Sequence, residues 1–307
     1  VRSALVAAND RARTFKECAE IYIEKHGKRF RSAKHRDQWP ATMNAYAYSE
    51  IGKLIVGDID HVHIIKILQP MWDDGKFETA RRVRGRIEQI LNWATVMGYR
   101  KGDNPARWHG FLGEVFSKPH DVRVKHHAAL PLTDVPRFMR HLRDTECQGA
   151  RALEFAILTA SRSGEVRGAV WDEFDLEKAI WTIPGPRMKA GKEHAVPLSS
   201  AALRLLVGLP RIGSRRVFSA PRGGALSDMT LAAVIKRLHG SETKAGRPGY
   251  LDTKEGRIAT PHGVARSSFR DWVAECTDYP REVAEMALAH SIGNQVEAAY
   301  RRSKIIK

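Results

Sequence analysis

The chain has 307 residues, more than one domain usually holds, so we expect two domains, each large enough to bury a core. Lysine and arginine total 51 against 35 acidic residues, and this net charge of +16 favours a polyanionic partner, with nucleic acid as the first candidate. The 3 cysteines are widely spaced, which excludes a disulfide framework and a zinc knuckle.

The sequence also predicts a cytoplasmic, soluble protein without a membrane partner. No apolar run reaches the roughly 18 residues that a membrane span requires, and no stretch resembles a signal peptide. The chain begins at Val1 rather than at a methionine. We therefore expect that residues are missing upstream, through processing or truncation.

Residues 1–112 are predicted to form a helical domain of four helices. Apolar residues recur at steps of three and four over residues 15–23, 64–71 and 83–94, and each stripe is typical of a helix with one buried face. Asp58 and Asp60 are candidate caps for the second of these stretches, and glycine and proline in residues 98–105 end the last one.

Residues 113–130 are predicted to be a linker, because Gly113 and Pro119 interrupt the periodicity and the basic residues here have no apolar face. The adjacent pair His126 and His127 suggests a metal ligand at first sight. No carboxylate or cysteine follows at ligand spacing, so we expect these imidazoles to be solvated and the protein to bind no metal.

Residues 131–307 are predicted to form a second domain, rich in helix and carrying a small sheet. Thr133 is a candidate cap for a helix that extends to Leu142, and residues 152–160 form an apolar helix. Residues 179–184 and 194–198 are typical of short strands joined by a polar turn, and helices follow from residue 199. The expected fold class is mainly α with a small β-sheet (α+β).

Three residues of this second domain are candidates for work on a phosphate. Arg162 lies where the apolar helix gives way to a new one, and its planar guanidinium can donate two parallel hydrogen bonds to phosphate oxygens. Glu165 can support it or cap the next helix. Lys189, in the hairpin turn, can donate a proton to a leaving oxygen. Taken singly, the first two also fit a surface ion pair, and the lysine fits a solvated turn residue.

Four residues near the C-terminus complete the candidate set. His262 and Arg266 are four residues apart, so they share a helix face and can address one phosphate, or else pair with a carboxylate such as Asp271. His290 and Tyr300 follow. A free phenol has a pKa of about 10 and needs nearby positive charge or a base to act as a nucleophile, whereas a tyrosine in an alanine-rich helix is usually a core residue.

Taken together and in this order, these residues resemble those of the tyrosine recombinase family. The sequence strings around them resemble those of phage and genomic-island integrases. The resemblance covers residues 150–302 and is carried by six strings, which are specific as a set: Ser161-Arg-Ser-Gly-Glu165, Arg187-Met-Lys-Ala-Gly-Lys-Glu-His-Ala-Val-Pro-Leu198, Thr260-Pro-His-Gly263, Arg266-Ser-Ser-Phe-Arg-Asp-Trp272, Leu288-Ala-His290 and Val296-Glu-Ala-Ala-Tyr-Arg-Arg302.

The resemblance implies a site-specific DNA recombinase that cuts and rejoins strands by transesterification. In that family's chemistry Tyr300 would form a 3′-phosphotyrosyl bond, Arg162 and Arg266 would clamp the scissile phosphate, and Lys189 would be the general acid. The two histidines of the set would support proton transfer and phosphate contact. Such enzymes need neither metal nor ATP, so the resemblance implies no cofactor.

The resemblance also implies the domain roles and the partners. Residues 1–112 would be a core-binding domain and residues 131–307 the catalytic domain, which together enclose duplex DNA. We expect Arg82, Arg86 and Lys192 to contact that DNA. The partners are then double-stranded attachment sites and further copies of the chain, forming a tetramer on DNA but a monomer or weak oligomer without it. The resemblance leaves room for an accessory DNA-bending protein.

Three departures from the family leave alternatives open. The histidine and the second arginine are usually three residues apart, whereas His262 and Arg266 are four apart, so the start of this helix must differ locally. The family's tail after Tyr300 and its arm-binding domain before Val1 are nearly absent or absent, so the chain is either a fragment or lacks both pieces. The rival interpretations are a type IB topoisomerase-like enzyme and a catalytically silent DNA-binding protein.

Overall fold

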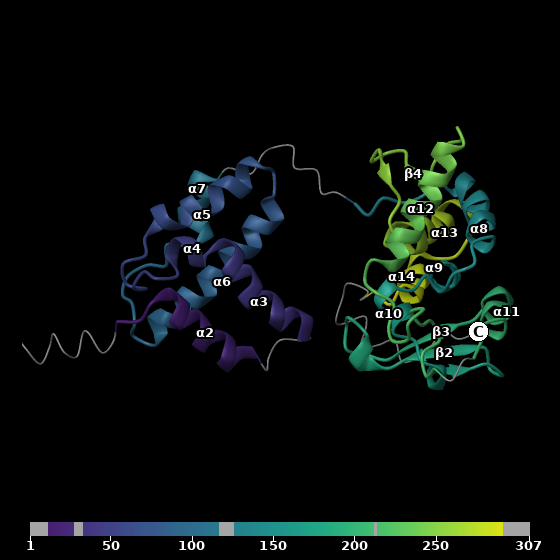
Figure 1. Cartoon of the computed structure of the whole chain (residues 1–307), viewed down its shortest axis with the longest axis horizontal. Helices are drawn as coiled ribbons and strands as arrows, with labels where there is room; N and C mark the ends of the chain where they lie inside the picture. The colour runs from purple at the N-terminus through teal and green to yellow at the C-terminus, as the bar shows by residue number, and fades with distance from the viewer. Residues whose placement is uncertain (1–11, 28–32, 117–125, 212–213, 291–307) are drawn as a thin grey trace, which may run out of the picture. The chain divides into compact units, whose positions relative to one another are not determined.

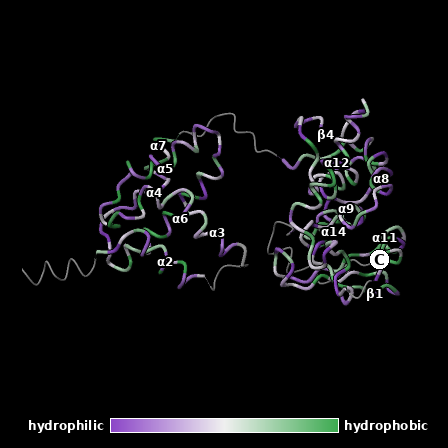
Figure 2. Tube along the Cα trace, in the orientation of Figure 1, coloured by the Kyte–Doolittle hydropathy of each residue, from purple (hydrophilic) through white to green (hydrophobic). Residues whose placement is uncertain are grey.

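The computed structural model describes residues 12–27, 33–116, 126–211 and 214–290 (Figure 1). The chain divides into two compact units on either side of the bond between Arg123 and Val124, and each unit has its own hydrophobic core. Hydrophobic and hydrophilic residues alternate along the helices of both units, as one-sided burial requires (Figure 2). Within the described residues, no helix combines the length and the apolar character of a membrane span.

The first unit is helical, and its capping residues set where the helices begin. Thr14 and Glu17 form a capping box in which each side chain accepts the other's backbone N–H, at 3.3 and 2.8 Å. The predicted cap Asp60 accepts hydrogen bonds from two backbone N–H groups of the following turn. The helices are α2 (Phe15–His26), α3 (Ala33–Tyr46), α4 (Tyr48–Ile51), α5 (His61–Asp73), α6 (Phe77–Val96) and α7 (Gly113–Val115), with a kinked turn at Trp108–Leu112.

The core of the first unit is built from the three apolar stripes seen in the sequence. Helix α6 packs against α2, α3 and α5. Fully buried residues from all three stripes meet in this core, which confirms the predicted helices and their inward faces: Phe15, Cys18, Ile64, Leu68, Val83, Ile87 and Leu91.

The second unit is mainly helical with two small sheets, which confirms the expected fold class. Helix α9 lies among α8, α10, α11, α12 and η6. The elements are α8 (Val135–Arg143), α9 (Gln148–Leu158), α10 (Ser163–Arg167), β1 (Phe174–Asp175), β2 (Ile180–Ile183), β3 (His194–Pro197), α11 (Ser200–Val207), α12 (Thr230–Lys244), β4 (Leu251–Asp252), β5 (Arg257–Ile258), the π-turn η6 (Gly263–Ser267), α13 (Ser268–Cys276) and α14 (Arg281–Ala287), with 3-10 turns at Leu132–Asp134, Trp171–Glu173 and Gly185–Arg187.

The main sheet has the order β1-β2-β3 and is antiparallel throughout. Trp181 and Ile183 of β2 are buried and alternate with less buried neighbours, as expected for a sheet with one covered face. Phe155 of α9 packs on this face against Trp181, with ring centroids 5.3 Å apart. The two strands predicted on either side of residues 185–192 are therefore present and paired. Residues 189–193 of the turn between them are exposed.

Two features of the segment between the domains differ from the simplest expectation. Both ends of the predicted linker are packed, since Phe116 is buried in the first unit and Leu130 in the second. Thr133, the predicted cap, is not the N-cap of α8. Leu132–Asp134 forms a 3-10 turn, Asp134 is the N-cap, and the helix starts at Val135. Pro136 then occupies the first turn of α8, where a residue without an N–H is tolerated.

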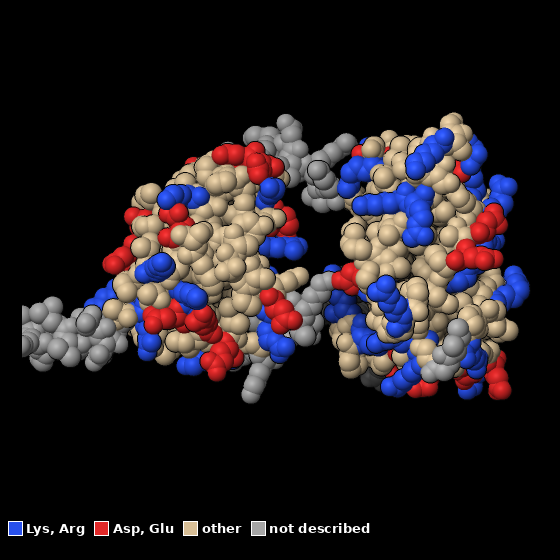
Figure 3. Space-filling view, in the orientation of Figure 1, with Lys and Arg blue, Asp and Glu red and all other residues tan. Residues whose placement is uncertain are grey.

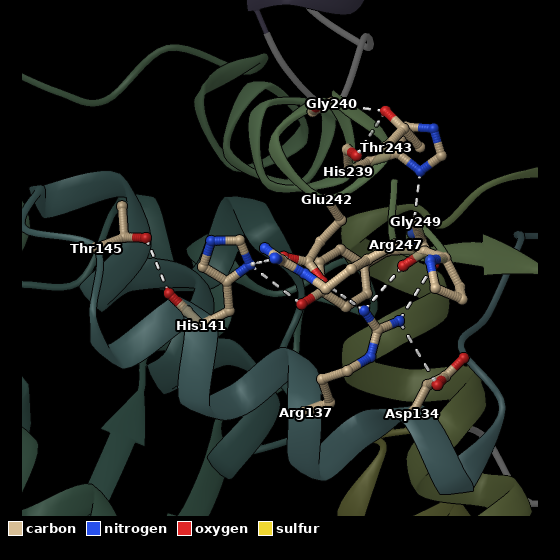
Figure 4. A network of polar contacts seen from close by, with 12 residues as sticks. Asp134, Arg137, His141, Thr145, His239, Gly240, Glu242, Thr243, Arg247 and Gly249 are labelled. Atoms are coloured by element: carbon tan, nitrogen blue, oxygen red, sulfur yellow. Dashed lines mark hydrogen bonds and ion pairs between the residues drawn. The ribbon is translucent and has the colours of Figure 1, made fainter. Parts of the chain in front are cut away.

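A buried carboxylate fastens three parts of the second unit together (Figure 4). Glu242 of α12, with only 6% of its side chain exposed, accepts hydrogen bonds from Arg137 of α8 at 2.6 Å and from Arg247 at 2.7 Å. Its carboxylate also lies 3.6 Å from the imidazole of His141. The hydrogen bonds from Arg247, followed by the neighbouring positive charges, hold the pKa of Glu242 below its ordinary value. Helix α12 is therefore tied to α8 at the end remote from the main sheet.

We expect Glu242→Gln to lower the melting temperature markedly. The substitution removes the carboxylate that pairs with Arg247 and the nearer of the two that pair with Arg137, in a site that is partly shielded from water. The matched control is Asp172→Asn, which removes an exposed partner of Arg215 and should leave Tm within about 1 °C of the parent chain. Thermal unfolding followed by circular dichroism checks both. Equal Tm values for the two variants would show that the network does not stabilise the unit.

Candidate active site

Arg162 is positioned by a sharp turn between two helices. Helix α9 ends at Leu158, and Ala160 then adopts a left-handed backbone conformation with φ of 49°. Arg162 is the N-cap of α10, and the carboxylate of Glu165 accepts both its backbone N–H and its Nη1, each at 2.8 Å. Glu165 therefore performs both roles that the sequence suggested, because it caps the helix and holds the guanidinium.

A second ion pair, between Arg187 and Glu173, also supports this turn, and the sequence analysis missed it. The guanidinium of Arg187 pairs with Glu173 and also donates a hydrogen bond to the backbone carbonyl of Glu165. Glu173 accepts a further bond from the indole of Trp181 at 3.0 Å. A Cβ on Gly168 would lie 2.8 Å from Nη2 of Arg187, so the absence of a side chain here lets the guanidinium approach this closely.

Arg266 is the most deeply buried cation of the site, with 3% of the residue exposed. Its Nη1 donates to the carbonyl of Ala160 at 2.7 Å, and its Nη2 donates to the carbonyl of Leu288 at 2.6 Å. Nη2 also lies 2.8 Å from Nε2 of His290. Burial, together with the nearby charge of Arg162, lowers the pKa of Arg266 to about 10, so the guanidinium stays charged at neutral pH.

The four-residue spacing between His262 and Arg266 is absorbed by a π-turn. Residues Gly263–Ser267 are π-helical, and the N–H of Ser268 donates to the carbonyl of Gly263. A π-turn holds one residue more than an α-turn, so the helix accommodates the additional residue and still places Arg266 in the buried site. A Cβ on Gly263 would lie 1.7 Å from the carbonyl oxygen of Ala128, so only glycine fits at the start of this turn.

His262 lies at the entry of the π-turn and is half-buried. Its ring stacks on the ring of His127, with centroids 4.1 Å apart and planes at 28°. Burial, then the neighbouring His127 and the two site arginines, lowers the pKa of His262 to about 4. The imidazole is therefore neutral at physiological pH and able to accept a proton.

His290 follows α14 and reaches Arg266 through a turn in which Ala289 has φ of 48°. An arginine can only donate, so Nε2 of His290 accepts from Arg266, and Nδ1 carries the proton and donates to Glu285 at 2.6 Å. Burial opposes ionisation of Glu285, but the bond from His290 and the charges of Arg270 and Arg281 outweigh it and keep the pKa of Glu285 below its ordinary value.

His194 of β3 is a further member of this cluster that the sequence analysis did not single out. It bonds to the backbone carbonyl of Ala287 and is influenced by the charges of Glu165, Arg162 and Arg266. Burial is the main reason that the pKa of His194 lies below its ordinary value. Nothing in the sequence marked His194 as a site residue, because a half-buried histidine in a strand is common.

The remaining predicted residues lie on the turn between β2 and β3, in the first unit or outside the described residues. Lys189 and Lys192 are exposed on that turn. Tyr300 lies outside the described residues. In the first unit, Arg82 is exposed beside Glu78, whereas Arg86 donates to the carbonyl of Gln38 at 2.6 Å and so ties α6 to α3.

The chemistry of the described site is that of fixed positive charge beside neutral imidazole. Two guanidinium groups and two imidazoles converge, and the carboxylates of Glu165 and Glu285 each hold one of them in place. No group of three or more histidine, cysteine or acidic side chains among the described residues is arranged to hold a metal ion. Such a site is suited to binding a phosphate group and to stabilising negative charge that develops on it.

Comparison with known proteins identifies the family. Residues 15–111 match the phage integrase central domain and residues 129–305 match the phage integrase family. The chain therefore belongs to the phage integrase family. It is 28% identical over 266 residues to the prophage integrase IntA of Escherichia coli K12, which covers 85% of this chain and 59% of that protein. It is 27% identical over 312 residues to the integrase of Enterobacteria phage P4, which covers 96% of this chain and 66% of that protein.

Solved structures share the fold. A lambda integrase dimer bound to a COC′ core site matches with a TM-score of 0.72 at 18% identity, covering 100% of this chain and 84% of that chain. The Tn1549 transposon integrase in complex with transposon right end DNA matches with a TM-score of 0.71 at 12% identity, covering 95% and 96%. The chain spans between about three fifths and two thirds of the length of the two relatives named above.

We expect the neutral state of His262 to make stability depend on pH. The imidazole has a pKa of 6.5 in the unfolded chain and about 4 in the folded one, so between these values the unfolded chain binds more protons. The free energy of unfolding therefore falls as pH drops from 6.5 towards 4, and His262→Gln should weaken this dependence. Urea midpoints measured across that range test the effect, with the exposed His126→Gln as control. An unchanged pH dependence in His262→Gln would contradict it.

Proposed function

We propose that this chain is a site-specific DNA recombinase, an integrase, that cuts and rejoins DNA strands through a 3′-phosphotyrosyl intermediate. The observation that carries the proposal is the convergence of Arg162, Arg266, His262 and His290 in one partly buried cluster of a strongly basic chain. These four residues come from three segments that are distant in the sequence. The carboxylate of Glu165 orients Arg162, and that of Glu285 orients His290.

The proposed reaction is a pair of transesterifications. The phenolic oxygen of Tyr300 attacks phosphorus and the bond to the 5′ oxygen breaks, so one phosphodiester replaces another and no external energy is required. The phenolic proton passes to a base, for which neutral His262 is the candidate, and Lys189 protonates the departing 5′ oxygen. Attack by a 5′ hydroxyl on the phosphotyrosine reverses the step and rejoins the strand.

The two arginines would act on the phosphate during this reaction. Arg162 and Arg266 carry fixed charge in a site from which water is partly excluded, and there hydrogen bonds to developing negative charge are stronger than in water. His290 accepts from Arg266 and so fixes the direction of its guanidinium. These contacts leave the remaining donors of both arginines for the non-bridging oxygens.

Double-stranded attachment-site DNA is the proposed partner. Among the charged side chains on the face of the second unit seen in Figure 3, lysine and arginine predominate over aspartate and glutamate. The related solved structures are named as integrases bound to DNA, including a lambda integrase tetramer on a Holliday junction. By analogy we infer a tetramer on DNA, with a monomer or weak oligomer otherwise, acting in the cytoplasm. Arg82 and Lys192 are proposed contacts because their side chains are exposed.

The rival interpretations are less well supported. A catalytically silent DNA-binding protein was suggested by the spacing of His262 and Arg266, yet the π-turn keeps Arg266 bonded to Ala160 and His290. A type IB topoisomerase would use a similar cluster, but both matched family models and the named relatives are integrases. Relaxation of supercoiled DNA without site preference would favour the topoisomerase.

The first test traps the covalent intermediate. A nicked attachment-site substrate, which loses the 5′ fragment after cleavage, should give an adduct that resists SDS and forms equally well in EDTA. Tyr300→Phe should abolish the adduct, because it removes the attacking oxygen. Tyr279→Phe is the matched control, since Tyr279 is 65% exposed and is given no role. An adduct that persists in Tyr300→Phe, or disappears in Tyr279→Phe, would remove the nucleophile assignment.

The second test separates chemistry from DNA binding. Arg162→Ala should slow cleavage by about a thousandfold, the order expected for loss of a donor to developing charge. The dissociation constant for the same DNA should change little, because many other basic residues remain to contact phosphates. Arg215→Ala removes an exposed arginine as control and should cleave normally. Loss of binding in parallel with cleavage would show that Arg162 acts in DNA binding rather than on the scissile phosphate.

A further inference from the structure

The last residues of the segment between the two units are docked along the catalytic cluster. The carbonyl of Ala128 accepts the backbone N–H of Thr260 at 2.9 Å and its hydroxyl at 3.2 Å, and the same oxygen lies where a Cβ of Gly263 would be. The hydroxyl of Ser268 donates to the carbonyl of Leu130 at 3.0 Å. This segment therefore runs alongside both the entry of the π-turn and the start of α13.

Two side chains of the β4–β5 hairpin complete the docking. Arg257 donates to the carbonyl of His126 at 2.7 Å, and Asp252 accepts the backbone N–H of Ala129 at 2.7 Å. These bonds hold the backbone on both sides of His127. The side chain of His127 is thereby directed by a fixed backbone, although the residue itself is exposed.

The ring of His127 covers one face of His262. The two rings stack with centroids 4.1 Å apart, while Nδ1 of His262 is buried and has no hydrogen-bond partner among the described residues. The hydrogen bonds that orient Arg162, through Glu165, and His290, through Glu285, therefore have no equivalent at Nδ1 of His262. Among the described residues, the stacked ring of His127 is thus a contact able to hold the plane of this imidazole.

We propose that His127 is a positioning residue for the strand-transfer reaction, which fixes the imidazole of His262 by stacking and shields it from water. The proposal rests on the proposed function and extends the active site to His127, which belongs to the segment 113–130 that the sequence suggested was a linker. His127 does not touch the reacting atoms. It acts through His262, whose orientation decides whether a phenolic proton can be accepted along a productive line.

Shielding has a measurable consequence for the protonation of His262. The charged and titratable groups that face it are His127, Arg266, Arg162 and His290, and burial adds to their effect. Removing the stacked ring admits water and deletes one neighbouring titratable group, and both changes raise the pKa of His262. A phenyl ring in place of the imidazole keeps the cover and deletes only the titratable group.

The direct test is a titration of the full DNA-free chain by NMR with 15N-labelled histidine, in which the His262 signal is assigned by its loss in His262→Gln. We expect His127→Ala to raise the pKa of His262 by at least about one unit. His127→Phe should restore most of the parent value, and His126→Ala should not change it. His127 is exposed, so these variants should keep the parent fold, as circular dichroism can verify. A His262 pKa in His127→Ala equal to that of the parent chain would overturn the proposal.

The functional test uses single-turnover cleavage of the nicked substrate across a pH range. His127→Ala should cleave about tenfold more slowly near neutral pH, through loss of orientation, with an acidic limb displaced to higher pH. His127→Phe should recover most of the rate, and the DNA dissociation constant should stay within about twofold of the parent in both variants. Equal rates for His127→Ala and His126→Ala, or a phenylalanine variant as slow as the alanine variant, would overturn the proposal.

The two tests separate this proposal from the function it rests on. If the parent chain forms no adduct that Tyr300→Phe removes, the proposed recombinase activity fails. The titration of His262 needs no DNA and no activity, so it still decides whether His127 controls that imidazole.

Discussion

The buried guanidinium of Arg266 is the interaction on which the arrangement of the site depends. It joins the turn after α9, through Ala160, to the turn after α14, through Leu288 and His290. A charge removed from water is costly unless polar groups replace its hydration, and here two carbonyls and an imidazole nitrogen do so. The segments that carry Arg162 and His290 are therefore held in place by a residue more than a hundred positions from the first of them.

Because Arg266 is buried close to Arg162, the site has uncompensated positive charge that a bound anion would stabilise. Arg162 and Arg266 each lie within the other's field. Glu165 and Glu285 compensate them only in part, because Glu285 is shared with His290, Arg270 and Arg281. The pKa of Arg266 is lowered to about 10 but remains well above neutral, so the charge stays in the site rather than being discharged. A phosphate diester brings the missing negative charge and acceptor oxygens, and this complementarity, rather than any single residue, favours phosphoryl chemistry.

Local patterns predicted the fold and the residues whose partners lie nearby. The apolar stripes became helices, the strands on either side of residues 185–192 paired, and Glu165 met Arg162 within one turn. Contacts between distant segments had no such signal. Arg187 reaches Glu173 and the backbone of Glu165 across the sheet, and His194 faces the cluster from a strand, so only the packed structure brings them to the site. Arg86 also links two helices of its own unit through the carbonyl of Gln38, and its contact with DNA stays a prediction.

The spacing of His262 and Arg266 shows why a departure from a family pattern need not disable a site. An additional residue in an α-helix would rotate Arg266 by about 100° away from Ala160 and His290, to which it is bonded. The π-turn takes up that rotation over Gly263–Ser267, and the lack of a Cβ on Gly263 lets the carbonyl of Ala128 pack against the turn. The segment that leads in from the first unit is thus in contact with the very turn that corrects the spacing. The π-turn and the docked segment therefore pack directly against each other at the carbonyl of Ala128.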